Sequence, residues 1–346
     1  MKRKFILFVL TLVIIFSALQ ASAFEAKTKW SFKTAGLPTG GLKIHQNMLL
    51  FGDWTGQFYA LDKSSGSLLW SNKEGNGNAV AGNPQIFEDN VIFAHVDGEV
   101  TCLKISDGSL VWRYRQSQDD LGFNDGIAIG EGLVFAAKKE GELIALDIKD
   151  GHLIWSFKTS QNLQSAPAYG EGFVFLGEDN GIFDIIEAKT GKRVNGGGAG
   201  GSINTPVVEG GNLYVSAWDN SVQAVQIKDV IPLWNTKVKE PVTTSPVTAD
   251  GFIAAGTARG SVVVLNQKDG NFLWDKHIGS GSVIAKPLIA EGLVFAGTDH
   301  GNLEIIEADT GKAKFTVETQ YGVYSSPAYS EGVFYFFGDN KVQALQ

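Results

Sequence analysis

The sequence predicts an all-β fold, an eight-bladed β-propeller whose blades are four-stranded antiparallel sheets. One phrase recurs along the chain every 39–43 residues, and a fixed period of this length indicates a repeat architecture. Each unit also holds four short apolar stretches of alternating pattern, separated by Gly, Asn and Asp, as in an antiparallel meander. Four short strands in a unit of this size are typical of one propeller blade.

The recurring phrase is a Gly, an apolar alternation, a polar turn, a second Gly and then a Trp. It is clearest from Gly56 to Trp70 and from Gly141 to Trp155. Counted by its first residue, the units begin at Gly56, Gly98, Gly141, Gly181, Asn220, Gly260, Gly301 and Asn340. We expect the repeated Trp to be structural, with its ring buried between blades and its N–H bonded to backbone. These positions are Trp30, Trp70, Trp112, Trp155, Trp234 and Trp274.

The two ends of the chain complement each other. The last unit, which begins at Asn340, lacks its fourth strand, and residues 28–32 form an isolated strand pattern that carries Trp30. Pairing of the N- and C-terminal strands would complete the eighth blade. It would also remove the open sheet edges that promote aggregation.

Residues 1–23 have the order of a secretory signal peptide: a basic start, an apolar run from Phe5 to Leu19, and small residues up to Ala23. We therefore expect residues 24–346 to form the propeller in a periplasmic or extracellular location, with no transmembrane segment after cleavage. No Cys lies at the cleavage point, so lipid anchoring is not expected. Cys102 is the only cysteine, which rules out an intramolecular disulfide, and its apolar surroundings predict a buried, inert thiol.

The composition argues against several kinds of activity. With 29 basic and 37 acidic residues, the chain has a net charge of −8, which disfavours nucleic acid as a partner. The five His residues show no metal-ligand spacing, and no nucleophile elbow or phosphate loop is present. We expect no catalytic residue, no metal site and no cofactor.

The motif from Gly56 to Trp70 resembles the PQQ-like repeat, and this resemblance covers nearly the whole chain after residue 23. The family includes quinoprotein alcohol dehydrogenases and the outer-membrane assembly lipoprotein BamB, and in size and layout the chain is most similar to BamB. The resemblance implies a non-catalytic, monomeric scaffold that binds other envelope proteins. A secreted ligand-binding, carbohydrate-binding or sensor propeller is the alternative. A PQQ-dependent dehydrogenase is the least favoured, since such enzymes are much longer and many use two adjacent Cys.

A binding site is expected on one face, where the loops that enter the innermost strands meet the turns between second and third strands. By register, the channel is lined by Asn83, Asn124, Asp125, Gln164, Asn204, Thr244, Lys286 and Tyr324. Trp54 and Trp218 fall outside the repeat's Trp position, in equivalent turns of the first and fifth blades. Large exposed aromatic side chains indicate a partner or carbohydrate surface, unless each ring folds onto its own blade. Arg259, Lys138 and Lys139 occupy similar turns as candidate rim contacts.

Overall fold

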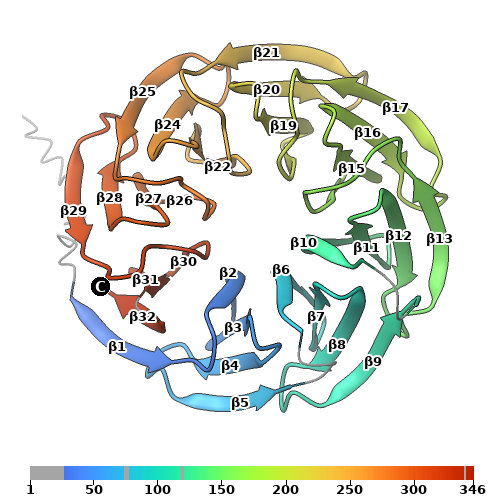
Figure 1. The fold of residues 1–346 in the computed structure, drawn as a ribbon, viewed down its shortest axis with the longest axis horizontal. Helices are drawn as coiled ribbons and strands as arrows, with labels where there is room; N and C mark the ends of the chain where they lie inside the picture. The colour runs from blue at the N-terminus through green and yellow to red at the C-terminus, as the bar shows by residue number, and fades with distance from the viewer. Residues whose placement is uncertain (1–26, 74–77, 118–120, 339) are drawn as a thin grey trace, which may run out of the picture.

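The computed structural model describes residues 27–73, 78–117, 121–338 and 340–346. These residues form eight four-stranded antiparallel sheets arranged in a ring, as the sequence predicts (Figure 1). No helix occurs in these ranges, and therefore none that is long and apolar enough to cross a membrane. The predicted signal peptide lies outside the described residues.

Each blade runs from the innermost to the outermost strand, except the last, which takes its outermost strand from the N-terminus. The strands of blades 1–4 are β2 (Pro38–His45), β3 (Met48–Asp53), β4 (Phe58–Asp62), β5 (Leu68–Asn72); β6 (Val80–Phe87), β7 (Asn90–His95), β8 (Glu99–Lys104), β9 (Leu110–Arg115); β10 (Phe123–Gly130), β11 (Leu133–Lys138), β12 (Glu142–Asp147), β13 (Leu153–Lys158); and β14 (Ala168–Gly170), β15 (Phe173–Gly177), β16 (Ile182–Glu187), β17 (Arg193–Gly198).

Blades 5–8 follow the same order. Their strands are β18 (Val207–Glu209), β19 (Asn212–Ala217), β20 (Ser221–Gln226), β21 (Ile231–Lys237); β22 (Val247–Ala249), β23 (Phe252–Gly256), β24 (Ser261–Asn266), β25 (Phe272–His277); β26 (Leu288–Ala290), β27 (Leu293–Gly297), β28 (Leu303–Glu307), β29 (Ala313–Val317); and β30 (Ala328–Ser330), β31 (Val333–Gly338), β32 (Lys341–Leu345), β1 (Thr28–Lys33).

The ring closes through the two ends of the chain. Strand β1 pairs antiparallel with β32, with Thr28 opposite Leu345 and Trp30 opposite Ala344. The backbones of Lys27 and Gln346 exchange two further hydrogen bonds of 3.1 Å. The predicted closure is confirmed, and it gives β32 a partner on both sides.

The repeat's Gly and Trp are explained by contact between neighbouring blades. The indole of Trp70 packs against Gly108 in the next blade, where a Cβ atom would lie 2.5 Å from the ring. The same indole donates a hydrogen bond of 2.7 Å to the carbonyl of Ile105. Equivalent bonds are made by Trp30, Trp112, Trp155 and Trp274. Trp234 differs from the expectation, because its buried indole nitrogen has no hydrogen-bond partner among the described residues.

The innermost strands are of two kinds. In blades 4–8 they have three residues and each begins directly after a proline: Pro167, Pro206, Pro246, Pro287 and Pro327. Proline lacks the N–H that a ladder needs, so the paired strand begins after it. In blades 1–3 the innermost strands have eight residues with a register shift inside them.

Glycines bring the three long innermost strands together. A Cβ atom on Gly40 would lie 2.0 Å from the carbonyl oxygen of Gly82. One on Gly82 would lie 1.9 Å from the backbone nitrogen of Gly126 and 2.4 Å from Oδ1 of Asp125. Only glycine permits this approach, and Gly40 and Gly82 also have positive φ angles of 66° and 58°. Blades 1–3 therefore form one continuous side of the channel wall.

The lone thiol is buried, as expected. Cys102 lies in the core between blades 2 and 3 with 1% of its surface exposed. Burial raises the pKa of its thiol to about 12. Because the thiolate is the reactive form, burial and the raised pKa both disfavour reaction of Cys102 at neutral pH.

Candidate functional site

A cavity of about 700 Å³ opens at the centre of the ring. Its wall is built from the innermost strands and the loops that enter them, which surround the centre in Figure 1. All eight side chains predicted from the register line it, and so do Trp54 and Trp218. We call the face onto which these loops and turns project the loop face.

Trp54 and Trp218 follow β3 and β19, on opposite sides of the ring (Figure 1). Their exposed fractions are 60% and 50%, so neither ring is folded away against its own blade. A partner that covered either indole would remove a large apolar surface from water, which favours binding. The two indoles are therefore available at the mouth of the cavity.

The turn that carries Trp54 is held by the buried carboxylate of Asp53. Its Oδ1 accepts hydrogen bonds from the backbone N–H groups of Thr55 (2.8 Å) and Gln57 (3.1 Å) and from the hydroxyl of Thr55 (2.7 Å). Its Oδ2 accepts from the N–H of Gly36 (3.0 Å) and the hydroxyl of Tyr59 (2.9 Å). Burial and the neighbouring Asp53 raise the pKa of Tyr59 to about 12, so its phenol stays a donor. The Trp54 turn is thus preorganised.

Asp219 plays the corresponding part beside Trp218. Its carboxylate accepts hydrogen bonds from the N–H of Gly200 (2.8 Å), the N–H and hydroxyl of Ser221, and the ammonium of Lys237 (2.6 Å). Burial acts to raise the pKa of Asp219, but these donors outweigh it and hold the pKa below its usual value. Both exposed indoles therefore stand beside fixed carboxylates.

Two other predicted channel residues, Asn124 and Tyr324, are fixed by hydrogen bonds. The amide of Asn124 donates to the carbonyl of Leu163 (3.1 Å) and to the side chain of Gln164 (2.8 Å). The hydroxyl of Tyr324 donates to the carbonyl of Asp299 (2.9 Å) and leaves the ring exposed. These bonds link blade 3 to blade 4 and hold Tyr324 at the cavity edge.

Among the basic residues, Lys138 does not lie on the surface, and its assignment as a rim contact is corrected. Only 3% of it is exposed, since its ammonium turns inward to Gln116 (2.5 Å) and Glu142 (3.5 Å). Lys139 is half-buried and donates to the carbonyl of Val96 (3.4 Å). Arg259 is exposed in the turn between β23 and β24.

Sequence reasoning missed several apolar side chains of the loop face. A second cavity of about 400 Å³ is lined by Leu37 and Tyr321, and it shares Tyr324 with the central one. Leu37 and Tyr321 are exposed, as are Leu121 and Ile284 in other loops that enter innermost strands. The sequence gives no signal that singles these side chains out, because the loops also hold other apolar residues such as Val283 and Val323. Only the structure shows that these four are exposed.

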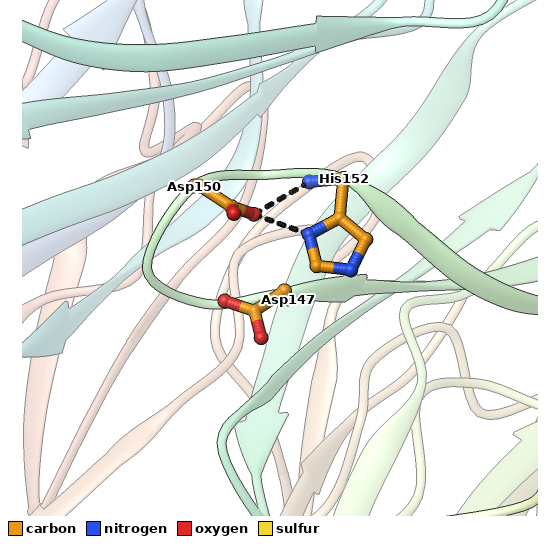
Figure 2. Close-up of side chains that lie close together, drawn as sticks. All are labelled: Asp147, Asp150 and His152. Carbon is orange, nitrogen blue, oxygen red and sulfur yellow. Dashed lines mark hydrogen bonds and ion pairs between the residues drawn. The ribbon is translucent and has the colours of Figure 1, made fainter.

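One cluster combines residue types that bind metals, although the sequence showed no ligand spacing. Asp147, Asp150 and His152 meet within 4.8 Å in the turn between β12 and β13 (Figure 2). The same turn recurs in blade 6 without the charge. There the side chain of Asn266 accepts a hydrogen bond from the N–H of Lys268, as Asp147 accepts one from the N–H of Lys149. The cluster is therefore accounted for by the turn itself. It also lies at the end of the blade opposite the loop face, because adjacent strands are antiparallel.

The fold and the site define the class: a closed eight-bladed propeller with a hollow, aromatic loop face. A family model described as "Outer membrane protein assembly factor BamB" matches residues 20–125, 117–195 and 197–346. The chain belongs to this family.

Two curated relatives are also similar. Each is an outer membrane protein assembly factor BamB, one from Escherichia coli K12 and one from Shigella dysenteriae serotype 1. Each is 25% identical over 120 residues, which is 34% of this chain and 30% of the relative. The chain thus matches less than a third of the length of these relatives.

Solved structures share the fold. The crystal structure of BamB from Moraxella catarrhalis has a TM-score of 0.79 at 17% identity, covering 93% of this chain and 98% of that one. A computationally designed protein, Ika8, has a TM-score of 0.78 at 17% identity, covering 90% and 97%. At this identity the likeness concerns the propeller alone.

Proposed function

We propose that this chain is a non-catalytic scaffold of the cell envelope, exported through its N-terminal signal, that binds other envelope proteins through its loop face. The description of its family, an outer membrane protein assembly factor, supports this proposal. The N-terminal basic and apolar order of residues 1–23 supports export.

The observation that carries the proposal is the exposed aromatic rim. Trp54, Trp218, Tyr321 and Tyr324 stand exposed around the two cavities of the loop face. Trp and Tyr are enriched among the residues that dominate binding energy at protein interfaces. Such residues typically lie at pockets that the partner fills, as these four do. Because the Trp54 and Trp218 turns are preorganised by Asp53 and Asp219, binding would cost little ordering entropy there.

The test uses site-specific photo-crosslinking in cells. A photoreactive residue at position 218 is expected to capture a discrete envelope protein, identified by mass spectrometry, and a Trp54→Ala background is expected to reduce the yield. A photoreactive residue at Leu69 is the matched control, since Leu69 is equally exposed but lies on the outer strand β5. Equal capture from both positions, or none from position 218, would contradict the proposal. Fractionation of the same cells tests export.

A further inference from the structure

The central cavity contains one charged residue that breaks the repeat. The position before the proline of the innermost strand is neutral and small in four blades, as Ala166, Thr205, Ser245 and Ser326. In blade 7 the same position is Lys286. The fold therefore does not require a cation at this position, and the repeat pattern does not explain Lys286.

The ammonium of Lys286 has no hydrogen bond or ion pair within the described part of the chain. Asp125, from blade 3 across the ring, is the only other Asp, Glu, Lys, Arg or His in the described lining. Its carboxylate is already engaged, with the N–H of Gly126 (2.7 Å), the hydroxyl of Thr205 (2.8 Å) and the N–H of Ala166 (3.3 Å). Burial lowers the pKa of Lys286, and the charge of Asp125 opposes this only in part. Lys286 is half-buried in the cavity wall, so its charge is partly removed from water, and an anion bound beside it would compensate for that loss.

The neighbours of Lys286 offer hydroxyl groups. Ser245 of blade 6 and Ser326 of blade 8 occupy the same repeat position on either side of Lys286, and both line the cavity. No hydrogen bond to either side-chain hydroxyl is found among the described residues. The three side chains thus form an arc of one cation flanked by two free hydroxyls, which matches a carboxylate with hydroxyl groups beside it.

The rest of the lining suits the same ligand. Asn83 and Gln85 present further side-chain amides from blade 2, and Trp54 and Trp218 provide flat apolar faces at the mouth. The volume of about 700 Å³ lies within the range of roughly 300–1,000 Å³ seen for small-molecule sites. A larger apolar ligand would leave this many polar groups unpaired, which is costly.

We propose that the central cavity binds a small hydroxylated carboxylate of the acidic-monosaccharide class, with the carboxylate on Lys286 and neighbouring hydroxyls on Ser245 and Ser326. This proposal concerns the interior of the cavity. It stands or falls separately from protein binding at the rim.

Isothermal titration calorimetry of the purified protein with D-glucuronate, D-glucose and inorganic phosphate tests it. Glucuronate is expected to bind, and glucose and phosphate to bind at least tenfold more weakly. Lys286→Ser, which installs the repeat's own residue, is expected to weaken glucuronate binding about 10–100-fold, the range of a lost charge-assisted hydrogen bond. Lys149→Ser is the matched control, because it removes a positive charge from the exposed turn between β12 and β13, at the end of the blade opposite the loop face, and it should bind glucuronate as the parent does.

Ser245→Ala provides a second variant that does not alter charge, with an expected loss of about fivefold for one neutral hydrogen bond. Circular dichroism and thermal unfolding verify that each variant is folded. The proposal is overturned if glucuronate does not bind, if glucose binds equally well, or if phosphate binds as tightly as glucuronate. It is also overturned if folded Lys286→Ser retains the parent's affinity.

Discussion

The glycine contact between the long innermost strands predicts a specific loss of stability in Gly82→Ala. The added methyl would lie 1.9 Å from the backbone nitrogen of Gly126, and backbone cannot swing aside as a flexible side chain can. The φ angle of 58° adds a left-handed conformation, which costs an L-residue about 1–2 kcal/mol. Overpacking costs a further 1–3 kcal/mol or so.

Gly132→Ala separates the two contributions. Gly132 has a φ angle of 75°, but a Cβ atom there would meet nothing within 4 Å. This control is expected to lose only about 1–2 kcal/mol, from its backbone angle alone. The loss in Gly82→Ala should exceed it by about 1–3 kcal/mol, which is the overpacking term.

Urea unfolding followed by circular dichroism measures both free energies of unfolding. The two variants should have similar m-values, so that the midpoints report stability directly. Equal losses in the two variants would refute the reasoning, since the close approach of blades 2 and 3 would then contribute nothing. The methyl group added in Gly82→Ala would also lie 2.4 Å from Oδ1 of Asp125, so it should displace this side chain and perturb the cavity wall.

Three further predictions concern the repeat Trp, the cavity cation and the ring closure. Trp112→Phe should lose about 1 kcal/mol more than Trp234→Phe in urea unfolding, because only Trp112 gives up a hydrogen bond; equal losses would contradict this. Lys286→Ser should be more stable than the parent at pH 7, because burial lowers the folded-state pKa of Lys286. Below that pKa the charged Lys286 destabilises the folded state, and this effect fades as the pH rises toward the usual pKa of 10.5. The stability advantage of Lys286→Ser in urea unfolding should therefore shrink between pH 7 and pH 10.5, and an advantage that grows would refute the sign. Deleting residues 27–33 should expose the edge of β32 and produce concentration-dependent oligomers in analytical ultracentrifugation, and a deletion variant that stays monomeric and equally stable would contradict the closure argument.

The placement of the predicted site residues shows where register arguments succeed. The period of two within strands and the period near 40 along the chain place Asn124, Asp125 and Tyr324 at the channel, and they line the cavity. The same arguments placed Lys138 on the rim, where the structure buries it. Register fixes the position of a Cα atom, whereas the direction of a long side chain depends on partners such as Gln116 and Glu142.

The sequence by itself determined the number of blades, the strands within them and the closure by β1 and β32, because these follow from repeated local patterns and from ends that complete each other. Only the tertiary structure decided which groups remain without a partner. Among the described residues, the indole nitrogen of Trp234 has no hydrogen-bond acceptor, and the carboxylate of Asp125 is already engaged by Gly126 and Thr205 and so does not pair with Lys286. Pairing across the ring depends on residues from different blades, and their distances are set only when the blades pack.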